Sequence, residues 1–141
     1  MLVKGLPTSK GDDRPMTGIL LIDHDRPFAQ RVGLACLERG IAVGIAENVC
    51  EGIRFLLDRP VSAVLVDSGL LRLPAVDQAK LFEAVAPGVP VVVLVSEEVP
   101  LPERVRYQVL GFQVLSKPFP VDDLVRKAEA LTAAASIRPG R

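Results

Sequence analysis

The sequence predicts a single α/β domain of the doubly wound kind, with a five-stranded parallel sheet between layers of helices. Short apolar runs alternate five times with longer segments whose apolar residues recur at helical spacing. The apolar runs are mostly continuous rather than alternating, which is typical of strands buried on both faces of a parallel sheet. The chain has 141 residues, and 49% of them are apolar, which is enough for one domain with a substantial core.

Five apolar runs are the predicted strands. They span residues 18–23, 41–46, 62–67, 89–95 and 112–117. Because the crossovers between parallel strands are right-handed, the helices are expected on both faces of the sheet. We expect residues 1–17, rich in Gly, Pro, Lys and Asp, to form a flexible leader. Residues 18–134 would then form the domain, and residues 135–141 a polar tail.

Residues that favour helix ends bracket the segments between the strands. Asp25 can cap the first helix, with Pro27 in its opening turn and Gly40 just past its end. Asn48 and Glu51 have the spacing of a capping box for the second helix. The other three helices are expected to begin near Pro74, Pro102 and Pro120.

Two expectations concern burial. The second helix is expected to have one apolar face, made of Val49, Ile53, Leu56 and Leu57. Cys36 and Cys50 lie within helical patterns and have no partner at metal-binding spacing, so we expect buried free thiols.

Charge and hydropathy exclude two classes of protein. The chain has 17 basic and 17 acidic residues, and this balance does not suggest direct binding to nucleic acid. Its apolar runs are far shorter than the roughly 20 residues needed to span a bilayer, and the first residues do not resemble a signal peptide. We therefore expect a soluble cytoplasmic protein.

Polar residues follow the strands at the point where each strand ends. Asp23 ends the first strand, Asp67 the third and Lys117 the fifth, and Ser96 follows the fourth. Ligands of open α/β sheets bind outside these carboxyl ends. Since unpaired charge is costly to bury, we expect these side chains to meet at one edge of the sheet.

This set suits phosphoryl transfer. A carboxylate can act as the nucleophile and form an acyl phosphate. The negative charge of the transferred group requires cations, which Lys117 and a magnesium ion held by carboxylates can supply. Ser96 can donate a hydrogen bond to a phosphoryl oxygen.

The blocks ILLIDHD, VLVDSGL, LVS and LSKPF occur in this order, and together they resemble the signature blocks of response-regulator receiver domains. The resemblance covers roughly residues 18–134. It implies a CheY-like, flavodoxin-like fold with strand order 2-1-3-4-5. It also implies a phosphoacceptor at Asp67, a phosphoryl-binding Lys117, a switch hydroxyl at Ser96 and a cis peptide bond between Lys117 and Pro118.

The resemblance further implies a magnesium ion held by Asp23, Asp67 and the backbone carbonyl of Gly69. The second acidic position of the family is occupied by His24, and imidazole is a poor ligand for magnesium. Asp25, one residue further on, is an additional candidate ligand, although helix capping competes for its carboxylate.

Other departures concern the loops and the signal readout. The loop after Asp67 is about three residues longer than is usual in the family. Glu97 and Glu98 follow Ser96, where the family has a small residue, and we interpret them as a solvated helix start. Val114 occupies the position of the family's switch aromatic.

The resemblance implies a single-domain two-component response regulator, a signalling domain rather than an enzyme. Asp67 would accept a phosphoryl group from a histidine kinase or phosphotransfer protein, and output would be through contacts with a downstream protein. The resemblance also allows a homodimer. One alternative is a pseudo-receiver that keeps the fold as an interaction module, which His24 and Val114 favour. A third possibility is a phosphohydrolase that uses Asp23 and Asp25. A flavin-binding protein is not favoured, because the chain lacks the phosphate-cradling loop that such a protein needs after its first strand.

Overall fold

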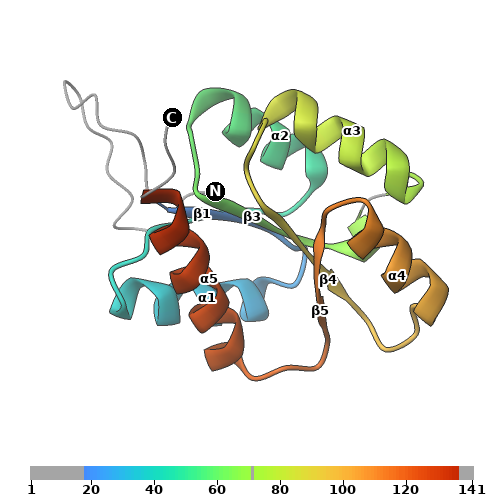
Figure 1. Ribbon diagram of the computed structural model, residues 1–141. Helices are drawn as coiled ribbons and strands as arrows, with labels where there is room; N and C mark the ends of the chain where they lie inside the picture. The colour runs from blue at the N-terminus through green and yellow to red at the C-terminus, as the bar shows by residue number, and fades with distance from the viewer. Residues whose placement is uncertain (1–17, 71, 137–141) are drawn as a thin grey trace.

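The computed structural model describes residues 18–70 and 72–136, and these form a three-layered α/β domain (Figure 1). The elements, in chain order, are β1 (Ile19–Ile22), α1 (Arg26–Glu38), β2 (Val43–Ala46), α2 (Val49–Asp58), β3 (Ala63–Asp67), η1 (Ser68–Leu70), α3 (Ala75–Val85), β4 (Val91–Val95), α4 (Leu101–Val109), β5 (Gln113–Ser116) and α5 (Val121–Ser136). The leader predicted over residues 1–17 lies outside the described residues.

The sheet is parallel throughout, in the order β2-β1-β3-β4-β5. The predicted fold class and strand order are therefore confirmed. In the centre of the sheet, Leu65 of β3 is aligned with Leu21 of β1 and with Val92 of β4. All five residues of β3 are buried, which explains why this strand reads as a continuous apolar run ending in Asp67.

Helices cover both faces of the sheet. Figure 1 shows α2 and α3 on one side and α1 and α5 on the other. Leu21 and Leu65 pack in the core beneath α1 and α5, whereas Leu20 and Val64 pack in the core beneath α2, α3 and α4. Among the described residues, no helix is long and apolar enough to cross a membrane.

The predicted helix starts agree with the structure to within one or two residues. The Asp25 side chain accepts a hydrogen bond from the backbone N–H of Phe28 (3.2 Å), and the Asn48 side chain accepts one from that of Glu51 (2.9 Å). The Glu51 carboxylate accepts a hydrogen bond from the backbone N–H of Glu47 (3.0 Å), whereas a capping box would use the N–H of Asn48. At the other end of the chain, α5 continues to Ser136, so helix extends into the segment assigned to the tail.

Two burial predictions for α2 were wrong. Leu57 is 70% exposed, and Cys50 is exposed rather than buried. The helix faces the sheet through Gly52 and Leu56, which turns residues 50 and 57 towards solvent. A side chain at Gly52 would come within 2.5 Å of the Ile22 side chain, so glycine permits the close approach that sets this orientation.

The two free cysteines are expected to differ in reactivity. Cys36 is fully buried, and burial raises the pKa of its thiol to about 11, so little reactive thiolate forms. Iodoacetamide should therefore alkylate Cys50 at least about a hundredfold faster than Cys36 in the folded protein. Peptide mass mapping over time measures both rates, and denatured protein provides the control. Equal rates in the folded protein would contradict the placement of Cys36 in the core.

Candidate functional site

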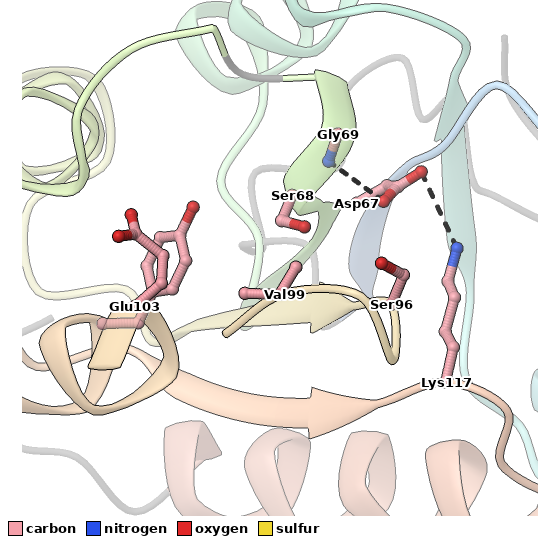
Figure 2. Close-up of a pocket in the computed structure, with 8 residues that line it drawn as sticks. Asp67, Ser68, Gly69, Ser96, Val99, Glu103 and Lys117 are labelled. Atoms are coloured by element: carbon pink, nitrogen blue, oxygen red, sulfur yellow. Dashed lines mark hydrogen bonds and ion pairs between the residues drawn. The ribbon is translucent and has the colours of Figure 1, made fainter. Parts of the chain in front are cut away.

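The polar residues at the strand ends meet at one edge of the sheet, as predicted. Asp67 ends β3, Asp23 and Ser96 directly follow β1 and β4, and Lys117 follows β5. These four strands are neighbours in the sheet, so their carboxyl ends lie side by side. An open pocket at this edge is shown in Figure 2, and it is lined by Asp67, Ser68, Gly69, Ser96, Val99, Glu103, Tyr107 and Lys117.

Lys117 bridges the two carboxylates. Its Nζ donates to Oδ2 of Asp23 at 3.3 Å and lies 3.7 Å from Oδ2 of Asp67. The ion pair with Asp67 is drawn in Figure 2. The same ammonium lies 5.3 Å from the centre of the Phe28 ring. Lys117 therefore pairs with both carboxylates, and Asp23 is the closer partner. The predicted cis peptide bond between Lys117 and Pro118 is also confirmed.

The two carboxylates differ in accessibility. Asp23 is completely buried, and its Oδ1 accepts from the backbone N–H of Asp25 (3.0 Å). Asp67 lines the pocket, and its Oδ1 accepts from the N–H of Gly69 (3.2 Å). Gly69 therefore orients one oxygen of Asp67 while the other faces Lys117. Of the two, Asp67 is the carboxylate that a reagent in the pocket can reach.

His24 lies beside both carboxylates. Its Nδ1 is 3.8 Å from Oδ1 of Asp23 and 3.7 Å from Oδ2 of Asp67, and the side chain is 68% exposed. Asp23, His24 and Asp67 place one ligand atom each within 4.8 Å of one another, close enough to share a metal ion. Asp25, the additional candidate metal ligand, instead uses its side chain to cap α1. A metal-binding role for the Gly69 carbonyl stays a prediction.

The loop that carries Ser96 is tied to α4 and β5 by Arg104. The Arg104 guanidinium donates to the carbonyl oxygens of Ser96 (3.0 Å) and Val99 (3.0 Å) and to the hydroxyl of Ser116 (2.7 Å). These bonds hold the backbone of Ser96 in place, and its exposed side chain lines the pocket. Its role as a switch hydroxyl stays a prediction.

Removing the Arg104 guanidinium is expected to loosen this loop. Arg104→Met should accelerate amide exchange at Val99, whose N–H donates to Ser96, by roughly tenfold, because each lost hydrogen bond contributes about 0.5–1.5 kcal/mol. Hydrogen exchange followed by NMR measures this. Arg106→Met is the matched control, because Arg106 lies on the same helix. Within the part of the chain that the structure describes, the Arg106 side chain pairs only with Glu103. Equal exchange at Val99 in both variants would contradict the role of Arg104.

One expectation about this loop was wrong. Glu97 and Glu98 are exposed, but they lie in a turn rather than in the first turn of a helix. The helix begins later, at Leu101, after Pro100. Pro100 occupies the N-cap, and its fixed φ suits the extended conformation there. The glutamate that lines the pocket is instead Glu103 of α4.

Sequence reasoning missed four residues of the pocket, which are Ser68, Val99, Glu103 and Tyr107. Figure 2 places Glu103 across the pocket from Lys117. Tyr107 is buried, and its hydroxyl accepts from Nε2 of Gln78 at 3.2 Å. Val99, Glu103 and Tyr107 recur at intervals of four residues, and this spacing was the sequence signal that could have placed them on one side of the pocket. Val114 is half-buried and packs against the core on the α3 and α4 side.

Solved structures share this fold. The receiver domain of the Francisella response regulator 1452 has a TM-score of 0.72 at 20% identity, over 86% of this chain and 98% of that one. A response regulator from Burkholderia pseudomallei, with a phosphorylated aspartic acid, calcium ion and citrate, has a TM-score of 0.67 at 20% identity, over 84% and 70% of the two chains. The chain has the fold of CheY-like receiver domains.

Sequence similarity points the same way. The transcriptional regulatory protein GlrR of Escherichia coli (strain K12) is 34% identical over 110 residues, which are 75% of this chain and 24% of GlrR. The chain spans 24% to 35% of the length of the curated relatives it matches. No family model matches the chain. The predicted resemblance to response-regulator receiver domains is confirmed.

Proposed function

We propose that the chain is a receiver unit of a two-component response regulator, and that Asp67 accepts a phosphoryl group from a histidine kinase or phosphotransfer protein. The observation that carries this proposal is the geometry around Asp67. One carboxylate oxygen is oriented by the N–H of Gly69, the other faces Lys117, and both belong to a residue that lines an open pocket.

In the proposed reaction, an oxygen of Asp67 attacks the phosphorus of a phosphohistidine. The new oxygen–phosphorus bond forms as the nitrogen–phosphorus bond breaks, and the electron pair returns to the donor imidazole, which takes up a proton. The Lys117 ammonium, 3.7 Å from Oδ2, is placed to neutralise charge on the phosphoryl oxygens. The Ser96 hydroxyl lines the same pocket and supplies a hydrogen-bond donor.

Receiver domains typically use Mg²⁺, and the residues present fit it only in part. The Asp23 and Asp67 carboxylates are suitable oxygen ligands for Mg²⁺, whereas the His24 imidazole beside them is not. A divalent cation held by the carboxylates would neutralise charge on the phosphoryl group.

The proposed output surface is α4. Its exposed apolar residues are Leu101, Val105 and Val109, which are 70%, 45% and 78% exposed. They recur every four residues and so share one side of the helix. Such a stripe suits a partner protein. We propose a cytoplasmic protein that binds a downstream protein or a second copy through this surface, without direct contact with nucleic acid.

The alternative is a pseudo-receiver that is never phosphorylated. Two observations favour it: His24 stands beside the carboxylates, and the aliphatic Val114 occupies the position of the switch aromatic. In that case the fold would serve only as an interaction module, and the α4 stripe would still bind its partner.

Phosphorylation by acetyl phosphate separates the two functions. The chain is incubated with acetyl phosphate and either Mg²⁺, Mn²⁺ or Co²⁺, and the intact mass is measured. A mass increase of one phosphoryl group that is lost in Asp67→Asn supports the proposal. Asp77→Asn, which changes an exposed carboxylate on α3, is the matched control and should be phosphorylated normally. An unchanged mass with every cation would overturn phosphorylation and leave the pseudo-receiver.

A further inference from the structure

The strand-edge site has an unusual set of candidate ligands. Two carboxylates, from Asp23 and Asp67, face one imidazole, from His24, and their ligand atoms lie within 4.8 Å of one another. His24 Nδ1 is nearly equidistant from the two carboxylate oxygens, at 3.8 and 3.7 Å. Two ligands bound to one ion at about 2.1 Å are roughly 3.0–3.4 Å apart in tetrahedral or octahedral geometry. The two contacts of His24 therefore need to close by less than about 1 Å to bind one cation, and the two carboxylate oxygens by less than about 2 Å.

The charge of the site also favours a cation. Asp23 is buried and Asp67 is nearly so, and Lys117 is the ammonium placed between them. Two carboxylates facing one ammonium leave a negative excess, which favours the binding of a cation. The existing hydrogen bonds do not prevent binding. Oδ1 of Asp23 accepts from Asp25, but a carboxylate oxygen has a second lone pair available.

The imidazole decides which cation fits. Mg²⁺ prefers oxygen ligands only, in strict octahedral geometry. Imidazole suits Zn²⁺, Co²⁺ and Ni²⁺, which bind mixed nitrogen and oxygen ligands more tightly than the lighter divalent ions do. The donor set of this chain thus disagrees with the ion that is usual for its fold.

We propose that the site binds a divalent transition-metal ion of the Co²⁺, Ni²⁺ and Zn²⁺ group in preference to Mg²⁺. The ligands are Oδ1 of Asp23, Nδ1 of His24 and Oδ2 of Asp67, with water at the remaining positions. The preference concerns binding alone and does not depend on phosphorylation of Asp67.

His24 makes the test specific, because it is the only histidine in the chain. The full chain is prepared without a polyhistidine tag and in a Cys50→Ser background, since an exposed thiol can itself bind soft cations. Calorimetric titrations with Co²⁺, Zn²⁺ and Mg²⁺ are run without any phosphodonor. Co²⁺ and Zn²⁺ should bind at least about tenfold more tightly than Mg²⁺. In NMR spectra, Zn²⁺ should shift the ring signals of His24 and Co²⁺ should shift or broaden them.

Substitution of His24 should change the preference. His24→Asp supplies a third carboxylate and is expected to bind Mg²⁺ more tightly and Co²⁺ more weakly than the parent. His24→Gln is expected to lose the preference without adding charge. Because His24 is largely exposed, both variants should remain folded, which circular dichroism checks. Asp77→Asn should leave all affinities unchanged.

Two results would overturn the inference. One is a Mg²⁺ affinity equal to or greater than that for Co²⁺ and Zn²⁺ in the parent. The other is a preference for Co²⁺ that survives in both His24 variants, with ring signals that do not respond. Failure here is distinct from failure of the proposed function. Transition-metal binding without phosphorylation would support this inference alone, and phosphorylation with Mg²⁺ but no Co²⁺ or Zn²⁺ binding would support the proposed function alone.

Discussion

Leu65→Ala is expected to lower the free energy of unfolding by roughly 2–5 kcal/mol. Leu65 is completely buried in β3, the central strand, between Leu21 of β1 and Val92 of β4. It packs into the core beneath α1 and α5, where neighbours on both sides prevent the structure from closing over a cavity. Urea denaturation followed by far-UV circular dichroism measures the change.

Leu57→Ala is the matched control for this substitution. It removes the same atoms from a leucine that is 70% exposed on α2, so the free energy of unfolding should change by less than about 0.5 kcal/mol. Similar losses in the two variants would contradict the burial pattern of α2. A negligible loss in Leu65→Ala would contradict the position of β3 at the centre of the sheet.

Lys117→Met is expected to lower the free energy of unfolding by about 2–3 kcal/mol near neutral pH. The substitution keeps an unbranched apolar chain but removes the ammonium that lies 3.3 Å from Asp23 and 3.7 Å from Asp67. Asp23 is completely buried and would be left without its closest cation. The expected loss is smaller than for a fully buried pair, because Lys117 itself is 28% exposed in its side chain.

Two further variants identify the cause of that loss. Lys80→Met changes an exposed lysine on α3 and should leave stability within about 0.5 kcal/mol of the parent. In an Asp23→Asn background, the cost of Lys117→Met should fall, because the buried charge that needs the ammonium is gone. An undiminished cost in that background would mean that the ammonium stabilises the domain through Asp67 or through its cation–π contact with Phe28 rather than through Asp23.

Local sequence determined most of the fold. Continuous apolar runs mark strands buried on both faces, and Asp25, Asn48 and Gly40 mark helix ends through contacts within a few residues. The polar residues at the strand ends were also predictable, because parallel strands bring their carboxyl ends to one edge. For the same reason, the convergence of Asp23, Asp67 and Lys117 followed from the sequence.

Only the tertiary structure decided how the elements face one another. The burial of Leu57 and Cys50 was mispredicted because the rotation of α2 is set by the contact of Gly52 with Ile22. Periodicity defines an apolar stripe but not which part of it faces the sheet.

The same limit applies around the pocket. Arg104 reaches the Ser96 loop, and Tyr107 reaches the pocket, because α4 packs beside β4 and β5. The position of His24 between two carboxylates is likewise a long-range result, since Asp67 is distant in sequence. The sequence by itself therefore determined the strands, the helix ends and the edge where the site lies. The tertiary structure decided which further side chains join that edge, among them Arg104 and Tyr107 of α4, because helix rotation depends on packing between distant segments.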